Sequence, residues 1–415
     1  MGSWREVQAE LGSEAPPGRG GAGCVAIGKQ RILVYGGADR TPTAFGDWWL
    51  LELGESGAHW TRISPVVKLS AKRKLLPRSG ASLTYLPAGD GSGEGKVLVY
   101  GGQEPVAGVM FDDLLCLDTA SWELTDVQLV APAAAAQQQA PAPLAGRQAQ
   151  QRQQQEQQEQ QPRRPPRPPA RHSHVAGVYE QRGLVIFGGA GLRGPLADVW
   201  VWQPEATAPD SGSGSGSSSS ASLAGSWRCL SDELAEDECP DAREMAAGAM
   251  ISDAGLLVHG GRGADGLLLN DIGIFDGRAG RWVLLQATGH ARCAHTACNA
   301  TSSGDCSASA ASAGTAAAGG ASGGGSSNVL LYGGFTGEAV AGDLLQLTFL
   351  RQQRSSGAHG LRAELRLVKA AAEAAPPPRF AHGAAVLSGP GAAEMVVVGG
   401  VNQTDDLADV HVWTV

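Results

Sequence analysis

The sequence lacks any apolar run long enough to span a membrane, and its N-terminus lacks the basic and apolar regions of a signal peptide. Positive charge is also scarce, because 32 Lys and Arg stand against 41 Asp and Glu, for a formal net charge of −9. Nucleic-acid binding needs a basic stripe, which this balance argues against. We therefore expect a cytoplasmic or nuclear protein that binds neither membranes nor nucleic acid.

Cysteine is present but without a disulfide pattern. The seven cysteines are an odd number and show no framework spacing. We therefore expect free thiols and a reducing compartment. The cysteines are Cys24, Cys116, Cys229, Cys239, Cys293, Cys298 and Cys306.

What the chain does contain is one pattern repeated six times. An apolar run such as RILVYGG or KVLVYGG ends in a Gly pair, and an Asp follows 9 to 11 residues later. The distance from the Gly pair to the Asp is nearly fixed, whereas the distance between successive Gly pairs varies. Such a pattern indicates a rigid repeated unit whose loops vary in length. The acidic residues are Asp47, Asp113, Asp198, Asp271, Asp343 and Asp409.

An arginine precedes each Gly pair. In the three repeats without an intervening insertion, it lies 17 residues before the first Gly. A Trp follows the Asp in repeats one to four (Trp60, Trp122, Trp227 and Trp282), whereas repeat five carries an aliphatic run over 363–368 instead. The six arginines are Arg19, Arg78, Arg171, Arg243, Arg292 and Arg379.

This combination of Arg, Gly-Gly, Asp and Trp resembles the Kelch repeat, and the resemblance covers essentially the whole chain. It implies an all-β fold, a six-bladed Kelch-type β-propeller of four-stranded antiparallel blades. Residues 3–7 read as an outermost strand and 409–415 as a third strand with nothing after it. We therefore expect the N-terminal strand to complete the last blade, which would leave no open gap in the ring.

The strands of one repeat can be placed from short β-branched and aliphatic runs bounded by Gly and polar turns. In repeat three we expect them at 174–180, 183–187, 198–202 and 226–230. A single sheet of this kind cannot bury both faces, so neighbouring sheets must pack on each other. The Gly pair would supply positive φ or close backbone approach near the centre.

We expect one propeller spanning residues 1–415, with low-complexity insertions near 131–170, 204–225, 299–327 and 351–361. Their composition is too poor in apolar residues to fold alone, so we predict flexible loops. Three of the insertions would emerge on one face of the disc. The opposite face carries the compact loops between the second and third strands and the connections between blades, which makes it the better candidate for binding.

The candidate binding residues are the six repeat arginines, with Arg193 and Arg262 from the compact loops. The resemblance implies that arginines at this position open the first strand near the central channel, where they reach acidic peptides in some Kelch domains. Arginine suits carboxylates because of its planar fork of donors. The alternative is that each arginine pairs with the Asp of a blade and ties loops together.

We expect no metal and no cofactor. His290, Cys293, His295 and Cys298 lie close together in sequence, but His295 follows Arg292 by three residues as His174 follows Arg171, so the repeat explains it. Copper-oxidase chemistry of the galactose-oxidase kind needs tyrosine ligands. Three of the five tyrosines precede Gly pairs, where a core role is expected.

The expected function is that of a protein-interaction scaffold or adaptor, monomeric and without catalytic residues, whose partner is a protein, including one with an acidic peptide segment. Two alternatives stay open. One is a substrate receptor of a ubiquitin ligase, which would need another subunit because no F-box or BTB segment precedes the repeats. The other is a sugar-acid isomerase or mutarotase that uses the same arginine pocket. Fold alone does not decide among them.

Overall fold

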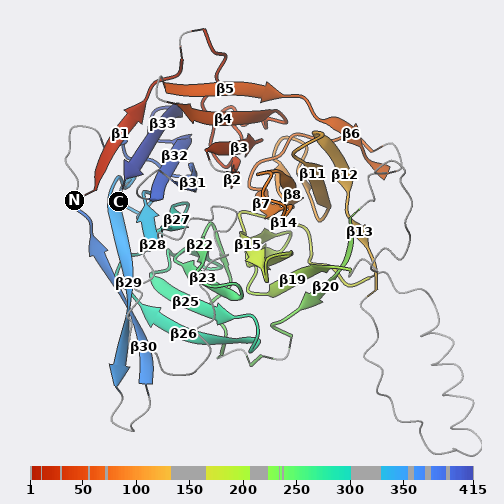
Figure 1. Cartoon of the computed structure of the whole chain (residues 1–415). Helices are drawn as coiled ribbons and strands as arrows, with labels where there is room; N and C mark the ends of the chain where they lie inside the picture. The colour runs from red at the N-terminus through yellow and green to blue at the C-terminus, as the bar shows by residue number, and fades with distance from the viewer. Residues whose placement is uncertain are drawn as a thin grey trace, which may run out of the picture.

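The computed structural model describes residues 2–10, 12–28, 30–54, 57–70, 73–131, 165–205, 223–232, 234–235, 238–300, 329–353, 359–369, 375–388 and 393–414. These residues form an all-β protein built from small antiparallel sheets (Figure 1). The predicted all-β fold class is confirmed. Within the described residues, no helix is long and apolar enough to cross a membrane.

The first three large sheets are consecutive in the chain and each uses one repeat. Sheet 1 contains β2 (Gly23–Ile27), β3 (Arg31–Tyr35), β4 (Trp48–Gly54) and β5 (Gly57–Ile63). Sheet 2 contains β7 (Ser82–Pro87), β8 (Gly95–Tyr100), β11 (Leu114–Asp118) and β12 (Glu123–Asp126). Sheet 3 contains β15 (Val175–Tyr179), β16 (Gly183–Phe187), β19 (Val199–Pro204) and β20 (Ala224–Cys229).

The remaining three sheets follow the same plan. Sheet 4 contains β22 (Ala247–Met250), β23 (Gly255–His259), β25 (Asp271–Asp276) and β26 (Arg281–Ala287). Sheet 5 contains β27 (Thr296–Asn299), β28 (Val329–Tyr332), β29 (Leu344–Gln353) and β30 (His359–Leu367). Sheet 6 contains β31 (Gly383–Ser388), β32 (Ala393–Val401), β33 (Asp406–Thr414) and β1 (Ser3–Val7).

The N-terminal strand completes the last sheet, as predicted. β1 pairs antiparallel with β33, from Ser3 opposite Thr414 to Val7 opposite Val410. Trp4 is buried there, and the centroid of its ring lies 5.1 Å from that of Tyr332 and 5.4 Å from that of Trp413. The two ends of the chain therefore lie side by side in one sheet (Figure 1).

The six sheets follow one another in a cycle. The innermost strands β2, β7, β15, β22, β27 and β31 lie next to each other in that order, and β31 lies next to β2 again. Six apolar clusters form the core, and each draws its residues from two neighbouring sheets. Each sheet therefore buries both faces against its neighbours, as the repeat pattern predicts.

A cycle of six backbone hydrogen bonds joins the inner ends of the sheets. Each donor lies two residues after a repeat arginine and has positive φ, between 52° and 68°. The N–H···O distances are 2.7 to 3.0 Å. Gly21 donates to Ala381, Gly80 to Gly21, Ser173 to Gly80, Met245 to Ser173, Ala294 to Met245 and Ala381 to Ala294.

The Gly pairs satisfy both predicted requirements. In the first pair, Gly36 and Gly37 have φ values of 68° and 92°. A Cβ on Gly36 would lie 2.3 Å from the carbonyl oxygen of Arg78 in the next sheet. The N–H of Gly37 donates to that same oxygen at 3.0 Å, so a side chain here would break a contact between sheets.

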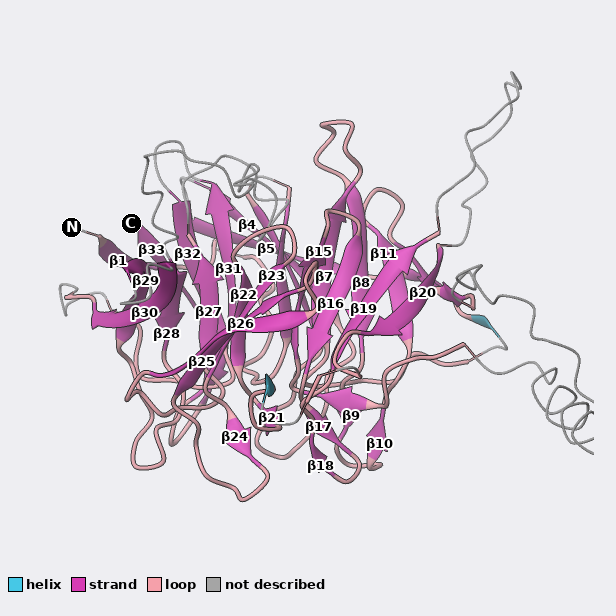
Figure 2. Cartoon of the chain, turned by 90° about the horizontal axis from the view of Figure 1, so that it is seen from below, coloured by secondary structure: helices cyan, strands magenta, loops and turns pink. Residues whose placement is uncertain are grey.

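Seven of the two-residue strands lie on one face of the molecule. They form hairpins in the compact loops or pair those loops with a repeat arginine, and Figure 2 shows most of them together below the large sheets. They are β9 (Gln103–Glu104), β10 (Val109–Met110), β14 (Arg171–His172), β17 (Ala190–Gly191), β18 (Gly194–Pro195), β21 (Arg243–Glu244) and β24 (Arg262–Gly263).

Two details of the predicted repeat are wrong. Trp122 does not lie in a strand, because it sits in a turn before β12 with φ of 55°. The stretch 351–361 is not wholly a loop, because 351–353 extend β29 and 359–361 begin β30, with Arg351 paired to Leu361. Backbone pairing needs no apolar side chain, so polar composition does not exclude a hairpin.

Most of the other three predicted insertions, namely 132–164, 206–222 and 301–327, lies outside the described residues.

The ends of the first insertion are held by the sheets. The hydroxyl of Tyr100 donates to the carbonyl oxygens of Pro168 and Pro169, and Arg167 lies 2.9 Å from Asp112. We expect that replacing 132–164 with a short Gly-Ser linker changes the free energy of unfolding by no more than about 1 kcal/mol, because loop-closure entropy varies slowly with length. Urea denaturation of both chains measures this. A larger loss would show that the segment packs on the sheets.

Candidate functional site

The six repeat arginines are buried and each binds the Asp of its own repeat through two hydrogen bonds. Their side chains are between 0 and 4 % exposed. The distances between guanidinium nitrogen and carboxylate oxygen are 2.6 to 3.3 Å. The pairs are Arg19 with Asp47, Arg78 with Asp113, Arg171 with Asp198, Arg243 with Asp271, Arg292 with Asp343 and Arg379 with Asp409.

The same guanidinium groups also hold the Gly pairs. In every repeat Nη1 donates to the carbonyl oxygen of the first Gly, at 2.8 to 3.1 Å, as Arg171 does to Gly188. Although burial raises the pKa of Asp343, hydrogen bonds from Arg292 bring it below its usual value. The carboxylate therefore stays ionised and the pair is neutral overall.

This geometry favours the alternative to the binding hypothesis for the six arginines, and the hypothesis itself stays a prediction. Their Nη groups bind within the repeat, their charge is neutralised by Asp, and water does not reach them. Among the described residues, the Nε groups of Arg78 and Arg292 are buried without a partner. A ligand carboxylate would have to displace the Asp and break the bond to the Gly carbonyl. The alternative, in which each arginine ties the loops of a repeat together, describes the observed contacts.

Four histidines with strongly lowered pKa values lie between neighbouring sheets. His174 and His382 sit three residues after their repeat arginine and approach hydroxyls of the preceding sheet, with Nε2 2.8 Å from Ser82 Oγ and Thr296 Oγ1 respectively. Burial lowers the pKa of His174 and of His382 to about 3. These rings are therefore neutral at physiological pH.

The other two buried histidines contact each other. His259 Nδ1 lies 2.9 Å from His295 Nε2, so one ring nitrogen donates to the other. Burial lowers the pKa of His259 to about 3 and that of His295 well below its usual value. The His and Cys sequence around residue 295 does not gather into a metal site, since no group of three metal-ligating side chains occurs among the residues described.

The two loop arginines differ from each other. Arg262 is half-exposed and its Nε donates to Glu244 at 2.8 Å, so its charge is paired. Arg193 is exposed at the tip between β17 and β18. Of the eight predicted binding residues, Arg193 is therefore the one that is exposed and forms no ion pair with an acidic side chain among the described residues.

The compact loops present apolar side chains that the sequence analysis did not single out. Leu192 is 80 % exposed, Val106 72 % and Leu267 66 %, and Phe335 is also exposed. They belong to four consecutive repeats and lie in the loops between the second and third large strands. Leu192 follows Gly191 and Leu267 follows Gly266, but a glycine beside a leucine does not by itself predict that the leucine is exposed.

Two of these loop tips are held by hydrogen bonds from a backbone N–H to a side chain. The side chain of Glu104 accepts from the N–H of Val106 at 3.2 Å, and Asp265 accepts from the N–H of Leu267 at 2.9 Å. An apolar residue held outward by an ordered turn loses little conformational entropy when a partner covers it. The arrangement suits binding of another surface more than it suits chemistry.

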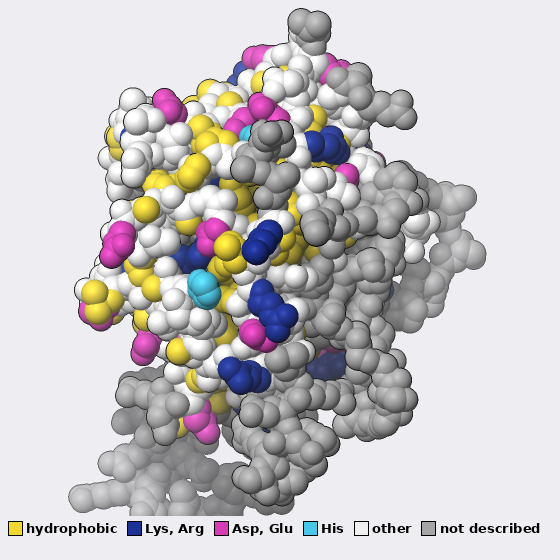
Figure 3. Space-filling view, turned by 90° about the vertical axis from the view of Figure 1, so that its left-hand side faces the viewer, with side chains coloured by type: hydrophobic (Ala, Val, Ile, Leu, Met, Phe, Trp, Pro, Cys, Tyr) yellow, Lys and Arg dark blue, Asp and Glu magenta, His cyan; other side chains and the backbone are white. Residues whose placement is uncertain are grey.

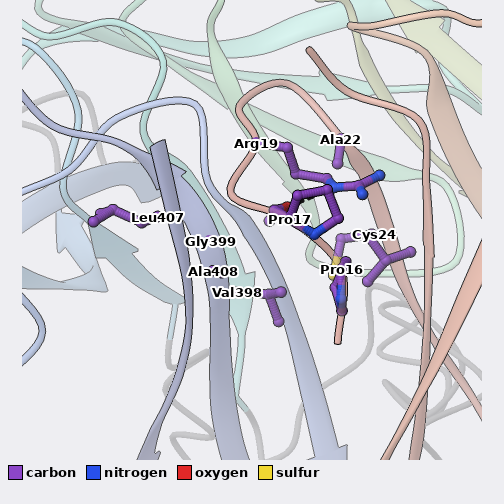
Figure 4. Close-up of a pocket in the computed structure, with 11 residues that line it drawn as sticks. Pro16, Pro17, Arg19, Ala22, Cys24, Val398, Gly399, Leu407 and Ala408 are labelled. Carbon is purple, nitrogen blue, oxygen red and sulfur yellow. Dashed lines mark hydrogen bonds between the residues drawn. The ribbon is translucent and has the colours of Figure 1, made fainter. Parts of the chain in front are cut away.

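A small pocket lies between sheets 6 and 1, next to Arg19. It is lined by Pro17, Cys24, Val398 and their neighbours (Figure 4). The space open to the centre of a water molecule there is about 10 Å³, so it admits roughly one water. This pocket is too small for a sugar acid.

Comparison with protein-family models and with curated proteins finds no match. The function is therefore inferred from the geometry described above.

Proposed function

We propose that the chain is a six-bladed β-propeller of the Kelch type that serves as a scaffold or adaptor for a partner protein. The support for the fold is the cycle of six sheets, the six apolar clusters between them and the closed set of backbone hydrogen bonds. The support for the family is the Arg, Gly-Gly and Asp contact that recurs in every repeat.

The partner binds the face formed by the compact loops. The observation that carries this is the exposure of Val106, Leu192, Leu267 and Phe335 in four consecutive loops on that face. Exposed apolar residues that gather on one face typically mark interaction sites, whereas single ones scattered over a surface do not. Complexes are commonly anchored by a few such side chains surrounded by polar contacts.

The anchors in this interface are apolar, and charge has a secondary role. Arg193 stands beside Leu192 and would meet an acidic residue of the partner at the rim. The six buried arginines do not contribute, because their charges are already paired. The isomerase alternative loses its main support for the same reason, since its carboxylate would need those guanidinium groups.

We expect the double variant Leu192→Ser and Leu267→Ser to weaken partner binding by about tenfold or more per side chain, because burial of a leucine contributes about 1.5–3 kcal/mol. Stability should stay within about 0.5 kcal/mol of the parent chain, because both side chains are exposed. Affinity capture from the source cell with each chain, followed by quantitative mass spectrometry, measures the loss.

The matched control is Val283→Ser with Leu285→Ser. Both residues are exposed apolar side chains, but they lie on β26 rather than on the loops. The loop variant should lose a set of captured proteins that the β26 variant keeps. If both variants capture the same proteins as the parent chain, the loop face is not the binding face.

A further inference from the structure

Several sheets have a covered outer edge. β6 (Val66–Lys68) pairs parallel with β12, and β13 (Gln128–Leu129) pairs parallel with β20. Ala9 forms a parallel bridge to Ala58 of β5. In each case the chain leaving one sheet adds a short segment outside the next. In the part of the chain that the structure describes, β26 and β30 have no such segment.

A side chain occupies part of the outer edge of β30. The Gln286 amide nitrogen donates to the carbonyl oxygen of Ala363 at 2.7 Å, and the Ala363 N–H donates to Gln286 Oε1 at 3.1 Å. The primary amide of Gln286 thus makes the two bonds that a peptide group of a neighbouring strand would make. This edge is shaped to pair with an amide, because both backbone groups of Ala363 point outward.

The backbone groups of Leu365 and Leu367 point the same way. Successive residues of a strand direct their N–H and C=O groups to opposite sides, and Ala363 is outward. Val368 confirms this phase, because its N–H donates inward to the Leu344 carbonyl of β29 at 2.8 Å. The backbone N–H and C=O groups of Leu365 and Leu367 therefore continue the outer edge of β30, where the Gln286 side chain already pairs with Ala363. Such an edge can pair with another chain.

The side chains around this edge define what would pair with it. Leu367 is 62 % exposed, and Arg362, Arg366 and Lys369 are exposed. The acid between them, Glu364, lies 3.1 Å from Arg366 and neutralises one charge. Figure 3 shows Lys and Arg side chains beside hydrophobic ones on the side of the molecule where β29 and β30 lie. This local positive charge contrasts with the net charge of −9.

We propose that the outer edge of β30 binds an extended acidic segment of a partner protein by strand addition. Its backbone pairs with the outward groups of Leu365 and Leu367, next to the Gln286 amide. Its acidic side chains meet Arg362, Arg366 and Lys369, and an apolar side chain covers Leu367. This is strand addition in which main-chain bonds supply affinity and side chains supply specificity. The site is separate from the loop face proposed above and uses none of its residues.

The probe is a short fluorescein-labelled peptide of alternating Val and Glu, titrated with the full chain at low ionic strength and followed by fluorescence anisotropy. The comparison peptides replace every Glu with Lys, or N-methylate alternate amides on the side that faces the protein. We expect the acidic peptide to bind about tenfold or more tightly than the lysine peptide, and N-methylation to cause a similar loss. Equal binding of the acidic and lysine peptides would overturn the proposal.

Two variants test the position. Leu365→Pro removes one outward N–H and no bond within the sheet, which an edge strand tolerates. Leu285→Pro is the matched control on β26, because Thr288 donates inward to Asn270 and so places Leu285 outward too. Binding should fall about tenfold in L365P and persist in L285P. Wild-type binding by L365P, or equal loss in both variants, would contradict the site.

The charge reversal Arg362→Glu with Arg366→Glu keeps the test independent of any effect of proline on folding, because both side chains are exposed. It should abolish the preference for the acidic peptide.

Sedimentation of the parent chain over a range of concentrations examines the other possible occupant, a second copy. A dimer that L365P converts to monomer would assign the edge to self-association and overturn the proposal.

Discussion

The variant Arg171→Met is expected to lower the free energy of unfolding by about 3 kcal/mol. Its guanidinium is fully buried and binds Asp198 through two bonds of 2.7 Å, as well as the carbonyls of Gly188 and Pro169. Loss of one partner of a buried pair leaves an uncompensated charge, which costs about 3–5 kcal/mol. We choose the lower end because the Asp198 side chain is 25 % exposed and keeps a bond from Trp200.

The measurement is urea denaturation of Arg171→Met, Asp198→Ala and the double variant. Because the two residues contact each other, the double variant should lose less than the two single losses added together. Arg193→Met is the matched control, since it removes an exposed arginine from the adjacent loop and should change stability by no more than about 0.5 kcal/mol.

The same variants separate the two interpretations of the repeat arginines. A structural arginine changes stability and leaves the affinity of each folded molecule for its partner unchanged. If Arg171→Met instead keeps its stability and loses affinity, the arginine reaches a ligand and the ion pair opens in the complex.

The spacing of the repeat predicted the ends of the four large strands of repeat three to within two residues. In repeat three, the third strand was expected at 198–202 and is found at Val199–Pro204. The pairing of β1 with β33 could also be predicted, because one end of the chain supplied a strand that the other end lacked. Both predictions depend on alternation and spacing, which the sequence contains explicitly.

The partner of each arginine could not be decided in the same way. Arg171 and Asp198 both occur at regular positions, but spacing along the chain does not say whether a side chain turns toward its own repeat or toward solvent. The tertiary contacts decide, because the carbonyl of Gly188 and the carboxylate of Asp198 surround the guanidinium. From the sequence alone, both interpretations are therefore open.

The exposed loop tips were missed for a related reason. Leucine in a loop is expected to fold back onto the core, and nothing in the sequence around Leu267 signals otherwise. Its exposure results from the turn in which Asp265 accepts its N–H. The contact between the Gln286 amide and Ala363 of β30 could not be predicted either, because these two residues lie 77 positions apart in the chain.

Acid is expected to destabilise the protein in two steps, the first from histidine. His174, His259 and His382 have a pKa of about 3 in the folded chain, and that of His295 is also far below its usual value, whereas an unfolded histidine titrates near pH 6.5. A lowered pKa means that the folded state binds fewer protons. The stability that the neutral rings provide is therefore complete above pH 6.5 and is lost as pH falls below it.

The charges that face these rings reinforce the effect of burial. Arg171 and His172 lie near His174, and Arg379 lies near His382, with Asp409 as the one opposing charge there. Around the other two rings, Asp271 opposes the guanidinium groups of Arg243 and Arg292, and neighbouring histidines add positive charge once they are protonated. Protonation therefore adds a charge where the neighbours are already positive.

The second step belongs to the carboxylates. Burial raises the pKa of Asp47 and Asp409, but hydrogen bonds from Arg19 and Trp49, and from Arg379 and His411, bring both below their usual values. Their contribution is present above the unfolded pKa of about 3.8 and is lost as pH falls through it. It therefore begins at a lower pH than the first step, which begins near pH 6.5, and it overlaps only with the end of that step between about pH 3.8 and pH 3.

By pH 5 each buried histidine should cost about 2 kcal/mol of unfolding free energy, and the four together approach the total stability of a typical domain. Urea denaturation between pH 7.5 and pH 5 should show a slope that rises to about one proton per histidine as pH approaches 5. The double variant His174→Ala and His382→Ala, which introduces the residue that other repeats carry at Ala22, Ala81 and Ala246, should reduce that slope by about half. Leu192→Ala, which removes no titrating group, should keep the parent slope. If the histidine variant also kept it, the acid response would come from groups other than these rings.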